Sequence, residues 1–217
     1  KNSDLLFMEI NLENISEKLG QHYSEKFKEF GAEPRGVDWG NIEDTIIRYK
    51  NMLALKCSFS SKRTSFLDVG CGYGGLLDYA ISRDFELDYF GIDVAQNMVD
   101  YAREKHPDSE FFQGDFLNYQ FHQKFDYVVC NGILTQKLET SIKEMEHFAN
   151  SIIKKMFEIS EIGIAFNVMS NRVNYMVDNL YYRSPSELME YCFDHLSRKI
   201  KIDHSYPIYE YTVYVYR

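Results

Sequence analysis

Two stretches of this chain end a buried strand with an acidic residue. Phe66-Leu67-Asp68-Val69 runs directly into the glycine-rich turn Gly70-Cys71-Gly72-Tyr73-Gly74, and Tyr89-Phe90-Gly91-Ile92 ends in Asp93. Glycines let a backbone approach a ligand closely, because a Cβ would collide with it. Two carboxylates at neighbouring strand ends suit a ligand that offers hydroxyl and ammonium donors and has no phosphate of its own.

Four motifs in this order resemble the class I S-adenosylmethionine-dependent methyltransferases, over roughly residues 60 to 217. The acid and glycines of the first motif are followed by Asp93, then by Gly114-Asp115. The fourth motif is the apolar run Phe125–Asn131, in which we interpret Asp126 as structural because it stands at the start of the strand. One such motif alone is weak evidence, whereas four in order are specific.

The resemblance implies a Rossmann-like α/β fold. Its sheet would have seven strands, six of them parallel and the last antiparallel, with helices on both faces. The alternation of strand and helix patterns along the chain favours the same parallel architecture. We expect strands near 65–69, 88–92, 109–112, 125–130, 161–167, 199–203 and 211–216, and helices over about 74–83, 95–105, 139–158 and 185–196.

A helical leader precedes this core. Ile10–Phe30 and Ile42–Leu55 have apolar residues at helical spacing, and the loop 31–40 between them is broken by proline and glycines. We therefore expect residues 1–58 to form an N-terminal helical lid and residues 59–217 to form the methyltransferase core. A polar and aromatic stretch near 170–183 is interpreted as a lid insertion.

The resemblance also implies which residues bind the cofactor, S-adenosyl-L-methionine, and its product S-adenosyl-L-homocysteine. Asp68 would serve the ammonium, Asp93 the ribose hydroxyls and Asp115 the adenine amine. Arg48 is a candidate for the cofactor carboxylate, since a guanidinium binds a carboxylate through two hydrogen bonds. The predicted cofactor-binding set is Asp68, Gly70, Cys71, Gly72, Gly74, Asp93, Val94, Met98, Asp115, Phe116, Asn131 and Arg48.

Methyl transfer depends mainly on alignment of acceptor, methyl and sulfur, although a hydroxyl acceptor also needs a base. We nominate His204, at the end of the expected sixth strand, with Tyr206 in the turn that follows. His22 and Tyr23 of the leader are further candidates because the leader is placed to close over the site. Each of these side chains also has a plain interpretation as an ordinary helix or turn residue.

Alternatives remain at this point. Gly70, Gly72 and Gly75 also satisfy the dinucleotide fingerprint, and Asp93 could bind a ribose hydroxyl of NAD. Asp68 beside a pyrophosphate would cost Coulomb energy, which disfavours that NAD-dependent oxidoreductase. N-methylation of an amine and a non-catalytic protein that binds S-adenosylmethionine as another enzyme's partner also stay open.

Composition excludes several classes of function. The chain has 217 residues and a formal net charge of −9, whereas a protein that grips nucleic-acid phosphates needs a basic surface. No run of about 18 apolar residues is present, so we expect no transmembrane helix. The first residues lack the apolar core and cleavage site of a signal peptide. We expect a cytoplasmic protein with a small-molecule acceptor, no nucleic-acid or membrane partner, and leave a homodimer open.

The cysteines form no Cys-x-x-Cys pair, so neither a zinc site nor a disulfide framework is indicated. Acidic residues and histidines also lack a metal-ligand spacing, so we predict no metal. Cys71 and Cys130 are interpreted as small buried residues near the cofactor. The four cysteines are Cys57, Cys71, Cys130 and Cys192.

The second half of the chain also resembles small bacterial methyltransferases of capsule and surface-polysaccharide gene clusters. Phe125-Asp126-Tyr127, Gly132-Ile133-Leu134 and the terminal Tyr209–Tyr216 carry this resemblance. It implies O-methylation of a sugar, a phosphoramidate or a related capsule precursor.

Overall fold

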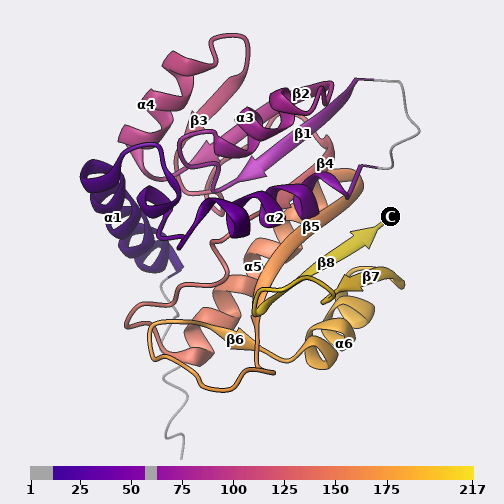
Figure 1. The fold of residues 1–217 in the computed structure, drawn as a ribbon. Helices are drawn as coiled ribbons and strands as arrows, with labels where there is room; N and C mark the ends of the chain where they lie inside the picture. The colour runs from indigo at the N-terminus through magenta and orange to yellow at the C-terminus, as the bar shows by residue number, and fades with distance from the viewer. Residues whose placement is uncertain (1–11, 57–62) are drawn as a thin grey trace, which may run out of the picture.

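The computed structural model describes residues 12–56 and 63–217, and Figure 1 shows their arrangement. Within those residues a single mixed sheet has the strand order β3-β2-β1-β4-β5-β8-β7, and β6 pairs with β5 off this path. The strands are β1 (Thr64–Val69), β2 (Leu87–Asp93), β3 (Glu110–Gln113), β4 (Phe125–Cys130), β5 (Ser160–Ser170), β6 (Tyr182–Arg183), β7 (Lys199–Asp203) and β8 (Glu210–Tyr216).

Among the described residues the main path of the sheet has seven strands, and one further strand lies off it. The additional strand, β6, has only two residues and pairs parallel to β5, so it is too short to give an alternating pattern in the sequence. β8 is antiparallel to both of its neighbours, β5 and β7, in agreement with the antiparallel last strand that we expected.

Helices cover both faces of the sheet. The expected core helices appear at the predicted places within a few residues, and a short 3-10 helix occupies part of the loop that we expected at 31–40. The predicted start of the first helix, Ile10, lies outside the described residues. The helices are α1 (Leu12–Phe30), η1 (Pro34–Val37), α2 (Ile42–Leu53), α3 (Gly75–Ser82), α4 (Gln96–Lys105), α5 (Ile142–Ile159) and α6 (Pro185–His195).

Alternation along the strands divides the core into two apolar layers. Phe66 of β1 is fully buried on one face with residues of α2, α3 and α4, whereas the next residue, Leu67, is buried on the other face with α5 and α6. Because successive side chains of a strand point to opposite faces, one apolar strand can fill both layers. This two-layer core fixes where the strand ends lie, and therefore where a site between them can form.

The leader packs against the carboxyl-end side of this core. Figure 1 shows α1 beside α4, and two hydrogen bonds join them: the Ser24 hydroxyl donates to the Asn97 side chain at 2.9 Å, and the Asn97 amide donates to the Ser24 carbonyl at 3.1 Å. Gly20 of α1 lies so close to Val94 that a Cβ there would be 2.6 Å from the valine side chain. The helix α1 therefore packs closely against the turn that follows β2.

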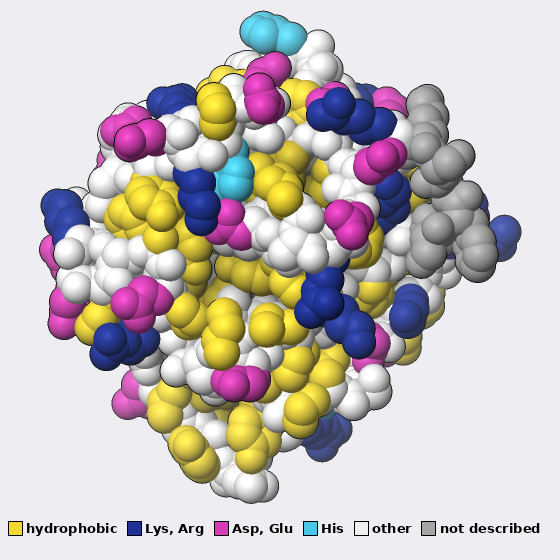
Figure 2. Space-filling view, turned by 45° about the horizontal axis from the view of Figure 1, so that its top comes forward, with side chains coloured by type: hydrophobic (Ala, Val, Ile, Leu, Met, Phe, Trp, Pro, Cys, Tyr) yellow, Lys and Arg dark blue, Asp and Glu magenta, His cyan; other side chains and the backbone are white. Residues whose placement is uncertain are grey.

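In the part of the chain that the structure describes, no helix combines the length and the apolarity that crossing a membrane requires. The same residues contain no group of three metal-ligating side chains. Cys71, Cys130 and Cys192 are buried free thiols, and Cys57 lies outside the described residues. On the face drawn in Figure 2, basic and acidic side chains are interspersed, with hydrophobic side chains open between them.

Gly91 in β2 gives a test of this packing. A Cβ added at Gly91 would lie 2.7 Å from the Cys71 sulfur and 2.8 Å from the Phe111 ring, closer than real Cβ contacts allow. We expect Gly91→Ala to lower the free energy of unfolding in urea by about 1–3 kcal/mol, because overpacking forces neighbours from their positions.

The matched control is Gly40→Ala, since a Cβ at Gly40 would meet nothing within 4 Å. We expect that variant to stay within about 0.5 kcal/mol of the parent chain. Equal losses from the two substitutions would contradict the close packing of β2 against the glycine turn.

Candidate functional site

The glycine turn after β1 forms the floor of a pocket at the carboxyl ends of the strands. Gly70, Gly72 and Gly74 adopt φ values of 74°, 53° and 84°, a left-handed region that favours glycine. The turn is fastened to β2, because the N–H groups of Gly70 and Cys71 donate to the Ile92 carbonyl at 2.8 and 3.1 Å. The predicted residues Asp68, Gly70, Cys71, Gly72, Asp93, Met98 and Asn131 line this pocket, which we call the cofactor pocket.

Asp93 joins the turns that follow β1 and β2. Its Oδ2 accepts from the Gly72 N–H at 2.9 Å, and its Oδ1 accepts from the Ala95 N–H at 2.8 Å. Burial raises the pKa of the Asp93 carboxyl, and the backbone hydrogen bonds oppose that rise. Each oxygen retains acceptor capacity, so the carboxylate has the geometry to accept both hydroxyls of a ribose.

Asp68 is almost completely buried, and only one of its two carboxylate oxygens accepts a hydrogen bond among the described residues. The Tyr89 hydroxyl donates to Oδ2 at 2.7 Å, while Oδ1 has no hydrogen-bond partner among the described residues. Burial raises the pKa of Asp68 to about 7, opposed by the Tyr89 hydrogen bond and assisted by the negative charge of Asp93. A buried carboxylate oxygen without a partner fits a ligand ammonium.

Asn131 supplies a second unsatisfied group in the same pocket. Both its amide nitrogen and its amide oxygen are buried without a partner in the described part of the chain. Asn131 follows β4, and the neighbouring Gly132 contributes to the pocket wall. Together with Asp68, this residue fits the polar amino-acid end of S-adenosylmethionine, which carries both hydrogen-bond donors and acceptors.

A second, adjoining cavity contains the residues predicted to bind adenine. Val94, Asp115 and Phe116 line it together with the α1 residues Leu19 and Gly20. Asp115 already accepts a hydrogen bond from the hydroxyl of Ser16 in α1 at 2.8 Å, a contact that no sequence motif indicated. An adenine amine at Asp115 would share or replace that contact.

The two cavities have volumes of about 60 Å³ each. Ligand pockets are usually about 300–1,000 Å³. α1 lines the adenine cavity, which is smaller than the usual ligand pocket. The remaining predicted glycine, Gly74, lies at the start of α3 and packs near His106 rather than lining the cofactor pocket.

Arg48 lies outside the cofactor pocket. Its Nε donates to both carboxylate oxygens of Glu210 at 3.0 and 3.1 Å, and its guanidinium lies 4.8 Å from the Trp39 ring. The structure therefore directs the guanidinium at a carboxylate of this chain instead of at the cofactor carboxylate. No sequence motif indicated this pairing, because the partners are separated by 162 positions.

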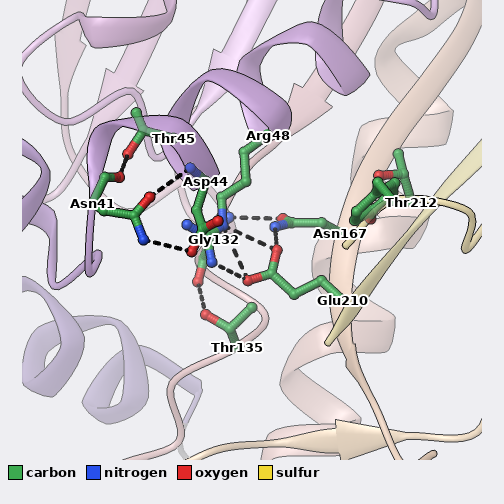
Figure 3. A network of polar contacts seen from close by, with 10 residues as sticks. Asn41, Asp44, Thr45, Arg48, Gly132, Thr135, Asn167, Glu210 and Thr212 are labelled. Atoms are coloured by element: carbon green, nitrogen blue, oxygen red, sulfur yellow. Dashed lines mark hydrogen bonds and ion pairs between the residues drawn. The ribbon is translucent and has the colours of Figure 1, made fainter. Parts of the chain in front are cut away.

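Figure 3 shows the polar network around this ion pair. Asn167 of β5 donates to Glu210 at 2.6 Å and accepts from the Gly132 N–H at 2.8 Å. The network thus connects α2, β8, β5 and the turn after β4. It fixes the backbone of Gly132, which lines the cofactor pocket.

The structure does not bring His204 or Tyr206 to the cofactor pocket. β7, which precedes both residues, is four strand positions from β1, and strands about 4.8 Å apart place it roughly 19 Å away. His204 is exposed to solvent, and its ring lies beside that of Tyr211. The Tyr206 hydroxyl lies 2.9 Å from the Thr212 hydroxyl. The strand-end argument was correct about the sheet edge but could not supply the strand order.

The two catalytic candidates of the leader, Tyr23 and His22, lie at different places relative to the cofactor pocket. Tyr23 lines both the cofactor pocket and the adenine cavity, and burial is the main cause that raises the pKa of its phenol. His22 points instead to Asp38, with 3.0 Å between Nε2 and Oδ2. Of the two, only Tyr23 is therefore positioned at the cofactor pocket itself.

A third cavity, of about 340 Å³, adjoins the cofactor pocket. Tyr23, Val37 and Trp39 form walls of both, so the two spaces are neighbours. The third cavity also contains the side chains of Asp38, Gln136 and Glu210, and we call it the acceptor cavity. Asp38 and Gln136 were missed from the sequence, since neither belongs to a motif and they come from separate loops.

Comparisons with known proteins agree with this geometry. A family model described as a methyltransferase domain matches residues 66–152. The chain is similar to Rv1506c of Mycobacterium tuberculosis, to which methyltransferase activity is ascribed. The two sequences are 33% identical over 158 residues, and the match covers 70% of this chain and 92% of that protein. The dTDP-3-amino-3,4,6-trideoxy-alpha-D-glucopyranose N,N-dimethyltransferase of Streptomyces venezuelae is 30% identical over 90 residues, covering 42% of this chain and 37% of that protein.

Among solved structures, the fold is similar to magnesium protoporphyrin IX methyltransferase from Synechocystis PCC 6803 with bound S-adenosylmethionine. The TM-score is 0.54 at 14% sequence identity, and the similarity covers 100% of this chain and 86% of that one. At this identity the comparison shows a shared fold. The structure with bound cofactor shows that this fold can hold S-adenosylmethionine.

Asp68 generates a prediction about pH. In the folded chain the pKa of Asp68 is raised to about 7, so folding favours its protonated form. The contribution of Asp68 to the stability of the cofactor-free fold is therefore fully present when the pH is below the usual pKa of an aspartate. It is lost as the pH rises through about 7. A ligand ammonium pairs with the ionised form. We therefore expect S-adenosylhomocysteine to bind about tenfold more tightly at pH 8 than at pH 6, measured by titration calorimetry.

Asp68→Asn is the control for this pH dependence, because the amide keeps the shape but does not ionise. We expect weaker binding and a clearly flatter change of affinity between the two pH values. An unchanged pH dependence in Asp68→Asn would assign the titrating group to another residue.

Proposed function

Since this chain belongs to the class I S-adenosylmethionine-dependent methyltransferases, we propose that it transfers a methyl group from S-adenosylmethionine to an oxygen atom of a small molecule. The proposed acceptor is a sugar, a phosphoramidate or a related capsule precursor. A cytoplasmic location belongs to the same proposal. The capsule setting rests on the sequence resemblance alone.

The observation that carries the proposal is the acceptor cavity beside the cofactor pocket. Its volume of about 340 Å³ lies at the small end of the usual range for ligand sites. Because Tyr23 and Trp39 line both spaces, an acceptor in this cavity would be adjacent to the cofactor. Methyl transfer requires mainly such alignment, so the arrangement supports a small acceptor.

The charges of the cavity favour some acceptors over others. Asp38, Asp44 and Glu210 contribute three carboxylates, whereas Arg48 is the single basic residue of the lining and is already paired with Glu210. A phosphate group would therefore meet an excess of negative charge. This supports a sugar hydroxyl over a phosphate-bearing precursor as the acceptor.

N-methylation of an amine is the second candidate. The same excess of carboxylates would attract an ammonium group, and the similar Streptomyces venezuelae protein is an N,N-dimethyltransferase of an amino sugar. That similarity covers less than half of this chain, so it supports the amine only as a second acceptor class.

We also propose that residues 1–58 act as a lid, with a further lid segment near 170–183. Two observations support this role for the leader: α1 closes the adenine cavity, and Trp39 and Arg48 border the acceptor cavity. From the second segment, Leu180 borders the acceptor cavity. Removal of α1 from the adenine cavity would admit the cofactor, and its return would exclude water.

The direct test is transfer of a radioactive methyl group from S-adenosylmethionine. The acceptors are glucose, glucosamine and glucose 6-phosphate, with reactions lacking an acceptor and reactions with excess S-adenosylhomocysteine as controls. We expect labelled glucose or glucosamine and little labelled glucose 6-phosphate, because of the acidic lining. Cofactor binding without labelling of any acceptor would favour the non-catalytic alternative, and labelling of only protein or tRNA would contradict the small-molecule proposal.

A further inference from the structure

Asp38 lies where the acceptor cavity meets the cofactor pocket. Its two neighbours in the chain, Val37 and Trp39, line both spaces, and Asp38 itself lines the acceptor cavity. Asp38 follows η1 with a φ of 60°, a left-handed conformation that few non-glycine residues adopt. Backbone conformations of this kind often occur at functional sites, where the surroundings hold them in place.

Three side chains from two other segments fix the Asp38 carboxylate. His22 Nε2 lies 3.0 Å from Oδ2, the Gln136 amide donates to the same oxygen at 2.9 Å, and Lys26 lies 3.3 Å from Oδ1. Gln136 is itself oriented, because the Asn179 amide donates to its carbonyl at 3.2 Å. The carboxylate is thus held by two contacts from α1 and one from Gln136, and a second loop orients Gln136.

The carboxylate is nevertheless accessible. The Asp38 side chain retains 26% of its exposure, and it faces a cavity large enough for a small ligand. A carboxylate accepts hydrogen bonds and has about four acceptor positions, so the contacts from His22, Gln136 and Lys26 leave one free. The remaining acceptor position suits an O–H or N–H group of a molecule in the cavity.

We propose that Asp38 binds the hydroxyl group, or the uncharged amine with its free lone pair, that becomes methylated and accepts its proton. This inference rests on the proposed function and names the residue that a hydroxyl or amine acceptor requires. As the proton moves to the Asp38 carboxylate, the acceptor oxygen or nitrogen forms its bond to the methyl carbon. The carbon–sulfur bond breaks, and its electron pair returns to sulfur, which leaves S-adenosylhomocysteine.

His22 has a supporting part in this scheme. It contacts Asp38 and borders a different surface hollow, so it is a positioning residue rather than a group that touches the acceptor. Charged and titratable side chains surround Asp38 and the acceptor cavity. These are His22 and Lys26 of α1, Asp44 and Arg48 of α2, and Glu210 of β8, together with the neutral phenol of Tyr23.

The test compares Asp38→Asn and Asp38→Glu with the parent chain. We expect kcat to fall about 100-fold or more in Asp38→Asn on whichever of glucose or glucosamine the parent methylates, because a general base contributes about 10²–10⁴. The affinity for S-adenosylhomocysteine should stay within about twofold. Asp38→Glu should recover part of kcat, because it retains a carboxylate that accepts a proton.

Glu43→Gln is the matched control, since Glu43 is an exposed acid in the first turn of α2 and does not line the acceptor cavity. We expect parent activity from it. A kcat for Asp38→Asn within about threefold of the parent would overturn the role of Asp38 and leave the proposed function intact. Absence of transfer by the parent to glucose and glucosamine would overturn both.

His22→Gln separates positioning from catalysis. We expect a smaller fall in kcat than in Asp38→Asn and a shift of the pH profile, since His22 lies against the carboxylate that takes the proton. Preference for glucosamine over glucose would identify an amine as the acceptor, and the reverse would identify a hydroxyl. A preference for glucose 6-phosphate would contradict the inference from the acidic lining.

Discussion

The hydrogen bonds of Asp93 are the constraint on which the candidate site depends. One carboxylate fastens the turn after β1, through the Gly72 N–H, to the turn after β2, through the Ala95 N–H. Both turns follow strand ends, where ligands bind in open α/β sheets. Asp93 thereby places its own oxygens, the glycine turn and Asp68 within one pocket.

This pocket concentrates negative charge in a region shielded from water. Burial raises the pKa of both carboxyls, and the negative charge of Asp93 adds to the rise at Asp68. A ligand that carries an ammonium group and a sulfonium relieves that cost, whereas a pyrophosphate would add to it. The electrostatics thus agree with the family assignment and explain why the dinucleotide alternative, which has the same glycines, does not fit.

The sequence predicted those parts of the fold that depend on local pattern. The glycine turn, Asp68, Asp93 and most helices and strands were found because each has a signature within a few residues. The distance of His204 from the cofactor pocket could not be predicted, because strand order is a property of the whole sheet. Pairings such as Arg48 with Glu210, or Gln136 with Asp38, depend on tertiary packing, and no short sequence window contains them.

The measurement that tests the central claim most directly is calorimetric titration of S-adenosylhomocysteine into the parent chain, Asp93→Ala and Asp88→Ala. Asp88 is an exposed acid on the same strand, β2, so it controls for loss of a charge there. We expect micromolar binding by the parent and by Asp88→Ala, and none by Asp93→Ala. Undiminished binding by Asp93→Ala, or binding of NADH in place of S-adenosylhomocysteine by the parent, would contradict the account.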